Sequence, residues 1–318
     1  MVHDGCMLNA PKISLAALLV LFAGCGDDSA TPGGGSPGGG GSSSSSPNTG
    51  GGGTTSDGGS GAGTNEGGAG GEGGSEPMGA GLPGGPSSDR LTVKPLGTVA
   101  GAEQGFWEYL PPSYGNGAKF PLLMFYHGIG ENGDGSEGAL NGVLNTGLPA
   151  LLKNDEWPEA QPFVILSTQH PGGGCHSDGE ISGFLSFAMA SYDIDPARVY
   201  ITGLSCGAIG GWGYLGNHTN EVVAAAVLIA GDGNGAFNQA GCSLGTVPIW
   251  ALHGDADGVV NVNGSINPIN NLNDCTDPAP VEAKLTLYPG VGHNSWDMTY
   301  DPEGPNDIYS WMLGYTNP

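Results

Sequence analysis

Apolar residues form short runs along the C-terminal part of the chain, and polar, glycine-rich segments separate these runs. One run, residues 121–127 (PLLMFYH), begins with proline and is followed by glycine, and such a continuous apolar run is typical of a strand buried on both faces of a sheet. The pattern of such runs predicts further strands. They are expected at residues 91–99, 106–110, 163–168, 199–203, 222–230, 247–253 and 283–288.

Between these runs, apolar positions recur at helical spacing. Residues 138–153 carry leucine or valine near every third or fourth position, which predicts one amphipathic helix. Further helices are predicted at residues 180–192, from residue 206 onward, and at residues 307–315. The alternation of strands and helices predicts an α/β fold in which helices cover both faces of a mostly parallel sheet.

The N-terminal part of the chain has a different composition. Residues 26–89 are almost only Gly, Ser, Pro, Thr, Asn, Ala and acidic residues. Such a segment cannot bury enough apolar surface to fold, so we predict a flexible linker with a root-mean-square reach of roughly 45 Å. We therefore expect one folded domain at residues 90–318, which the linker separates from the first residues of the chain.

The first residues of the chain resemble a targeting signal. Residues 13–22 (ISLAALLVLF) follow Lys12 and are too few to span a membrane comfortably. Ala23-Gly24-Cys25 comes next and resembles the lipobox of bacterial lipoproteins. The resemblance implies a signal peptide at residues 1–24, and a lipidated Cys25 that begins the linker segment of residues 25–89. The resemblance places the protein in the bacterial cell envelope, with the outer membrane favoured because Gly26 follows the cysteine. The alternative is ordinary cleavage and secretion.

Charge and cysteine content limit the partners. The formal net charge is −24, and binding to nucleic acid needs clustered cations, so we expect no nucleic-acid partner. Membrane contact is expected through the lipid only, and the protein is expected to be a monomer. Cysteine and histidine spacing does not suggest a zinc site, and the acid-rich stretches do not fit an EF-hand loop. We therefore predict no metal and no cofactor.

Four cysteines lie in the predicted domain, and three pairings of them are open. Cys242 and Cys275 both have loop-like surroundings rich in Gly, Asn or Pro, which favours a disulfide between them. Cys206 then either pairs with Cys175 or is a small buried thiol.

A nucleophile motif lies between a predicted strand and a predicted helix. Residues 203–207 (GLSCG) match G-x-S-x-G with Ser205 at the centre. The turn needs glycine on both sides of the serine because its backbone is crowded, and the following helix directs its N-terminus at the site. Two later motifs supply an acid and a base: residues 253–257 (HGDAD) and His293, each after a predicted strand. Their order matches that expected for Ser, Asp and His on this kind of sheet.

Residues 195–205 (DPARVYITGLS) and 126–129 (YHGI) resemble the α/β-hydrolase esterases related to polyhydroxyalkanoate depolymerases, feruloyl esterases and predicted peptidases. The likeness spans about residues 106–315 and implies an α/β-hydrolase fold. In the register of the family's acid loop, Asp257 is the acid, although Asp255 is a competing candidate. The residue after the serine is usually small or a methionine in this family, and Cys206 departs from that pattern.

The resemblance implies a serine esterase with Ser205, Asp257 and His293 as its triad. Backbone N–H groups of Ile129 and Cys206 would form the oxyanion hole. The expected reaction is hydrolysis of carboxylic esters through an acyl-enzyme, on a small or polymeric substrate such as a polysaccharide-linked ester or a polyester. A serine peptidase and a non-catalytic binding head are the alternatives.

Two further side chains are candidates for substrate contact. Trp296 lies close to His293 in the sequence, and His170 lies in a glycine-rich loop after a predicted strand. Burial of the tryptophan in the core, and a plain surface loop around the histidine, are the alternatives.

Overall fold

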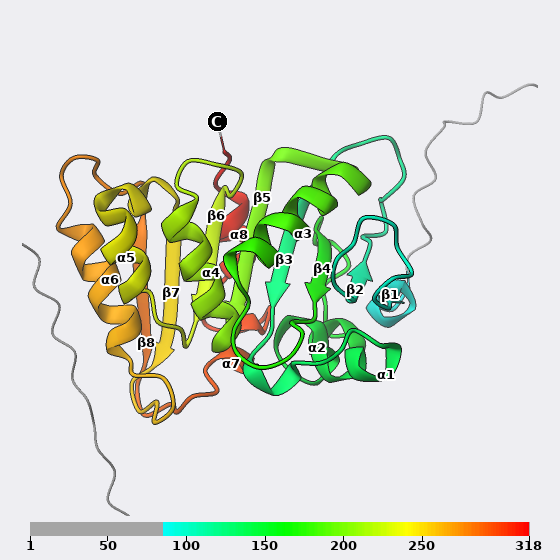
Figure 1. Cartoon of the computed structure of the whole chain (residues 1–318), viewed down its shortest axis with the longest axis horizontal. Helices are drawn as coiled ribbons and strands as arrows, with labels where there is room; N and C mark the ends of the chain where they lie inside the picture. Colours follow the sequence, from blue (N-terminus) through cyan, green and yellow to red (C-terminus); the bar gives the residue numbers. More distant parts are fainter. Residues whose placement is uncertain (1–84, 318) are drawn as a thin grey trace, which may run out of the picture. The chain divides into compact units, whose positions relative to one another are not determined.

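The computed structural model describes residues 85–317. Eight strands form one sheet in the order β1-β2-β4-β3-β5-β6-β7-β8 (Figure 1). The strands are β1 (Leu91–Lys94), β2 (Phe106–Tyr109), β3 (Phe120–Tyr126), β4 (Val164–Thr168), β5 (Ile194–Leu204), β6 (Ala225–Ile229), β7 (Ile249–Gly254) and β8 (Ala283–Tyr288).

Strand direction divides the sheet into two parts. β2 runs antiparallel to both of its neighbours, β1 and β4, whereas β3 to β8 are parallel. All seven residues of β3 are buried, because both faces of the sheet are covered by helices. Because β3 to β8 are parallel, their carboxyl ends share one edge of the sheet, and loops from several strands meet there.

Helices cover the two faces of the sheet in separate sets (Figure 1). Side chains of α3, α4, α5 and α6 pack in one core, and those of α2, α7 and α8 pack in the other. Successive residues of β3 alternate between these cores: Leu122 and Met124 belong to the first, Leu123 and Phe125 to the second. The helices are α1 (Glu137–Leu140), α2 (Gly147–Lys153), α3 (Asp178–Ser191), α4 (Cys206–Asn217), α5 (Asn234–Ala240), α6 (Asn263–Asn273), α7 (Trp296–Tyr300) and α8 (Ile308–Leu313).

The predicted α/β fold is confirmed, but several element boundaries were wrong. The single helix expected at residues 138–153 is divided into α1, a 3-10 segment (Asn141–Asn145) and α2. The division falls at Gly147, which has φ +61° and lies so close to Phe125 and Leu204 that a β-carbon would displace their side chains. The strand expected at residues 91–99 ends at Lys94, and α5, α6 and α7 were not predicted.

Two disulfides connect the four cysteines of this region: Cys175–Cys206 and Cys242–Cys275. The second is the expected pair, and the first decides the open alternative for Cys206 in favour of a disulfide. Both fit an oxidising compartment outside the cytoplasm. In residues 85–317 no helix is long and apolar enough to cross a membrane. The predicted signal peptide, Cys25 and nearly all of the predicted linker lie outside the described residues.

Candidate active site

Ser205 lies in a sharp turn between β5 and α4. Its backbone has φ +51° and ψ −118°, a region that non-glycine residues rarely adopt. The glycines on either side make the turn possible, because a β-carbon at Gly203 would collide with the backbone of Gly207, and one at Gly207 would collide with the carbonyl of Tyr126. The G-x-S-x-G motif therefore has a steric basis at both of its glycines.

The structure brings the three predicted triad residues into hydrogen-bond contact. The distance from His293 Nε2 to Ser205 Oγ is 2.9 Å, and the distance from His293 Nδ1 to Asp257 Oδ2 is 2.7 Å. His293 lies on the loop after β8, and Asp257 lies on the loop after β7. With Nδ1–H donating to the carboxylate, Nε2 is left to accept the Ser205 proton, which is the arrangement that general-base activation of a serine requires.

The side chain of Asp257 is buried and has several hydrogen-bond donors. Its Oδ1 accepts the backbone N–H groups of Val259 and Val260, at 2.8 and 3.0 Å. Burial alone would raise the pKa of this carboxyl, but the hydrogen bonds from His293 and from these two N–H groups outweigh it and hold the pKa below its ordinary value. Asp257 is therefore ionised at neutral pH. Asp255, the competing candidate, instead accepts the backbone N–H of Gly290.

A second histidine, which the sequence analysis did not assign a role, also contacts the acid. His253 Nε2 lies 3.0 Å from Asp257 Oδ2, and His253 Nδ1 lies 2.8 Å from Ser265 Oγ. Burial lowers the pKa of His253, although its hydrogen bond to Asp257 opposes this effect, so the ring is neutral. His253 is the first residue of the HGDAD motif, and its place in the same motif as Asp257 is the sequence feature from which this contact could have been inferred.

Of the two predicted oxyanion-hole residues, Cys206 directly follows Ser205, and Ile129 follows a glycine that lies beside Ser205. Cys206 is the first residue of α4, so its N–H has no carbonyl partner within the helix. Gly128 lies beside the serine, since a β-carbon built on it would be 3.6 Å from Ser205 Cβ, and Ile129 follows it. The two N–H groups therefore come from different loops at the same edge of the sheet.

The side chain of His127 fixes the peptide between Gly128 and Ile129. His127 Nε2 accepts the backbone N–H of His170 at 2.9 Å, so in the neutral ring Nδ1 carries the proton and donates to the Gly128 carbonyl at 2.6 Å. Burial lowers the pKa of His127 to about 4, which keeps the ring neutral. Because C=O and N–H point in opposite directions across a trans peptide, this hydrogen bond also sets the direction of the Ile129 N–H.

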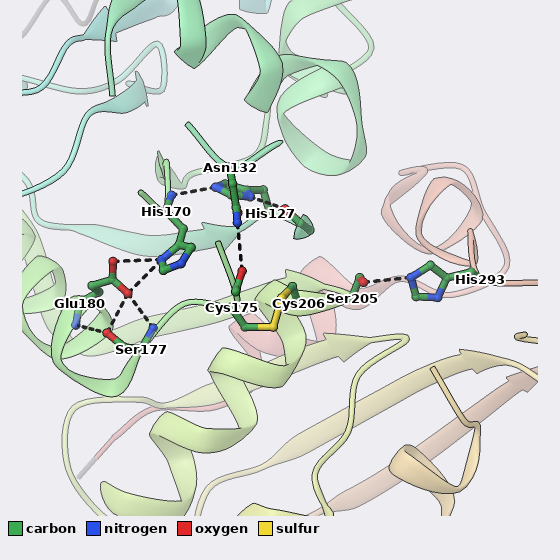
Figure 2. Close-up of a disulfide and its surroundings, with 11 residues drawn as sticks. His127, Asn132, His170, Cys175, Ser177, Glu180, Ser205, Cys206 and His293 are labelled. Carbon is green, nitrogen blue, oxygen red and sulfur yellow. Dashed lines mark hydrogen bonds and ion pairs between the residues drawn. A yellow bond between two sulfur atoms is a disulfide. The ribbon is translucent and has the colours of Figure 1, made fainter. Parts of the chain in front are cut away.

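The two candidate substrate contacts have different surroundings. The ring of Trp296 lies edge-on to that of His293, with 5.1 Å between centroids, at the start of α7. His170 is buried, and its Nδ1 lies 3.0 Å from Glu180 Oε1 (Figure 2). A role in substrate binding stays a prediction for both residues. Among residues 85–317, no group of three or more His, Cys, Asp or Glu side chains is placed to hold a metal ion.

The strand order, the turn at Ser205 and the Ser-His-Asp contacts together define the α/β-hydrolase fold with the side-chain arrangement of the serine hydrolases. No protein-family model matches the sequence, and no curated protein matches it significantly. A solved thermostable esterase is similar in fold, with a TM-score of 0.54 and 24% identity, over 72% of this chain and 64% of the esterase. This chain thus spans less than two thirds of that protein.

Two other solved structures have lower scores. A feruloyl esterase module from Clostridium thermocellum, complexed with sinapinate, has a TM-score of 0.49 and 17% identity, over 71% of this chain and 87% of the module. An acylaminoacyl peptidase from Pyrococcus horikoshii has a TM-score of 0.45 and 14% identity, over 71% of this chain and 40% of the peptidase.

Proposed function

We propose that the protein is a serine hydrolase that cleaves carboxylic esters through an acyl-enzyme. The observation that carries this proposal is the continuous chain of hydrogen bonds from Ser205 through His293 to an ionised Asp257. The similarity in fold to a solved esterase is compatible with it. The proposed substrate is a small ester, a polysaccharide-linked ester or a polyester.

In the proposed mechanism, His293 Nε2 takes the Ser205 proton while Oγ attacks the ester carbonyl carbon. The negative charge that develops on the carbonyl oxygen is stabilised by the N–H groups of Cys206 and Ile129. His293 then donates its proton to the leaving alcohol, and the acyl group stays on Ser205. Water, deprotonated by His293, releases the carboxylic acid in a second passage through the same steps. Asp257 holds the ring of His293 in the required tautomer and stabilises its charged form.

The test compares the full-length protein with its Ser205→Ala variant on p-nitrophenyl esters from acetate to palmitate. We expect hydrolysis by the wild type and a loss of at least about 10³-fold in kcat for the variant. The preferred chain length then defines the size of the acyl site. If the folded wild type hydrolyses none of these esters, the ester proposal fails, and peptide substrates become the next assay.

We further propose that a lipid on Cys25 attaches the protein to a bacterial membrane, with the outer membrane favoured, and that the protein acts there as a monomer. The lipobox-like residues before Cys25 support this proposal. Its test is a Cys25→Ala variant expressed in a bacterium supplied with labelled fatty acid. We expect the wild type to be labelled and to sediment with membranes and the variant to do neither; equal labelling of the two proteins would contradict lipidation at this cysteine.

A further inference from the structure

One of the two disulfides joins a loop to the turn that carries Ser205. Cys206 follows the serine directly and begins α4, whereas Cys175 lies in the segment between β4 and α3 (Figure 2). The proposed mechanism uses the N–H of Cys206 as an oxyanion donor. The disulfide therefore connects this segment covalently to one of the two donor residues.

The loop before Cys175 has few contacts of its own. Residues 171–174 are exposed, and within the described structure a β-carbon on Gly172, Gly173 or Gly174 would have no neighbour within 4 Å. Glycine loses more conformational entropy on ordering than any other residue, so this loop is unfavourable to order by itself. The side-chain amide of Asn132 donates to the Gly174 carbonyl at 3.0 Å, and the disulfide follows one residue later.

The residue after Cys175 is a buried histidine with unpartnered nitrogens. His176 is 4% exposed, and among residues 85–317 neither of its ring nitrogens has a hydrogen-bond partner. Burying a polar ring in this way is unfavourable unless something else holds it in place. The disulfide at the adjacent residue supplies that restraint, because Cys175 cannot leave α4 while the S–S bond is intact.

His176 in turn packs on the histidine that orients the other oxyanion donor. The centroids of the His176 and His127 rings are 4.6 Å apart, in edge-to-face geometry. His127 Nε2 accepts the N–H of His170, which belongs to the same loop, and its Nδ1–H holds the Gly128 carbonyl. A movement of this loop would therefore change the surroundings of the Ile129 N–H as well.

We propose that the Cys175–Cys206 disulfide is a positioning element of the oxyanion hole, which holds Cys206 directly and Ile129 through His176 and His127. This inference rests on the proposed function, since it concerns the stabilisation of the oxyanion in that mechanism. An oxyanion donor acts mainly on the transition state. Loss of the disulfide should therefore lower kcat much more than it changes KM.

The second disulfide provides a matched control. Cys242 and Cys275 are 33 residues apart, and Cys175 and Cys206 are 31 apart, so the two bonds restrict the unfolded chain to nearly the same extent. We therefore compare full-length C175S/C206S with full-length C242S/C275S on a p-nitrophenyl ester. We expect kcat of C175S/C206S to be on the order of 10²-fold below that of the control, with KM values within about threefold. Values of kcat within about threefold of each other would overturn the proposal.

If circular dichroism shows that C175S/C206S does not fold, the same bond can be opened in folded C242S/C275S protein with dithiothreitol. A thiolate of this dithiol attacks one sulfur, the S–S bond breaks to give two cysteine thiols, and the dithiol is oxidised to its cyclic disulfide. Thiol titration then has to find two thiols more than before reduction, and we expect the same fall in kcat, reversed on reoxidation with oxidised glutathione. Unchanged kcat in the fully reduced protein would overturn the proposal.

A fluorophosphonate separates failure of this inference from failure of the proposed function. Ser205 Oγ displaces fluoride from phosphorus, so the rate of labelling reports on the nucleophile and the oxyanion hole without an ester substrate. A wild type that hydrolyses no ester but is labelled allows the same comparison by labelling rate, with the same expected ratio. A wild type that is inactive in both assays contradicts both proposals.

Discussion

Burial of a neutral His127 predicts that the folded protein loses stability in mild acid. Burial lowers the pKa of this ring from 6.5 to about 4, an effect that its hydrogen bond to the Gly128 carbonyl only partly opposes. The folded pKa is below the unfolded one, so between these two values the unfolded chain binds a proton that the folded protein does not. The contribution of His127 to the free energy of unfolding is therefore fully present above pH 6.5 and is lost as the pH drops toward 4. A shift of about 2.5 units corresponds to about 3 kcal/mol.

The assay is urea unfolding followed by tryptophan fluorescence at a series of pH values from 7 to 4.5, for the wild type and for His127→Gln. Glutamine keeps a polar side chain at the site but does not titrate. We expect the wild type to lose up to about 1.4 kcal/mol more per pH unit than the variant below pH 6.5, which corresponds to one proton. The comparison uses only the change in the free energy of unfolding with pH, so a difference in absolute stability between the two proteins does not affect it. Parallel pH profiles for the two proteins would refute the argument that His127 is buried in its neutral form.

Two further predictions concern the acid and the turn. Asp257→Asn should lower kcat on p-nitrophenyl acetate by about 10³- to 10⁴-fold, because an amide can hold the ring of His293 in the wrong tautomer. The kcat of Asp255→Asn should stay within about threefold of the wild type. Equal losses in the two variants would contradict the assignment of Asp257 as the acid. Gly207→Ala should destabilise the fold by about 3 kcal/mol or more in urea unfolding, because its β-carbon meets the Tyr126 carbonyl. Gly213→Ala, in the same helix and open to solvent, should raise stability by up to about 1 kcal/mol, and similar behaviour of the two variants would exclude a steric requirement at Gly207.

The arrangement of the candidate site could be predicted because its chemistry is local in the sequence. Ser205 directly follows β5, Asp257 and His293 lie on the loops that begin at the ends of β7 and β8, and the carboxyl ends of parallel strands meet at one edge of the sheet. The order of the apolar runs and the motif that follows each one are therefore sufficient to predict which side chains meet at the site. The two glycines of the GLSCG motif also indicate the sharp turn, because the backbone there leaves no room for a β-carbon at either position.

Elements that depend on distant contacts could not be predicted in the same way. α6 has the sequence NGSINPINNLN with Pro268 inside it, so its intrinsic helix propensity is poor. It nevertheless forms a helix, because Ile269 and Leu272 are buried in the core beneath α5 and α6. The break before α2 has a similar origin, since the leucine spacing of residues 138–153 continues through Gly147 and gives no sign of the close approach of Leu204.

The hydrogen bonds of Asp257 show what the sequence motif alone leaves out. Oδ1 accepts two N–H groups from the acid's own loop, and Oδ2 is shared between His253, at the end of β7, and His293. Three of these four donors do not belong to the loop that carries His293. The carboxylate is therefore held in place by its own strand and loop, independently of the base. Because the acid does not depend on His293 for its position, the ring of His293 can shift between the Ser205 oxygen and a leaving group while Asp257 stays fixed.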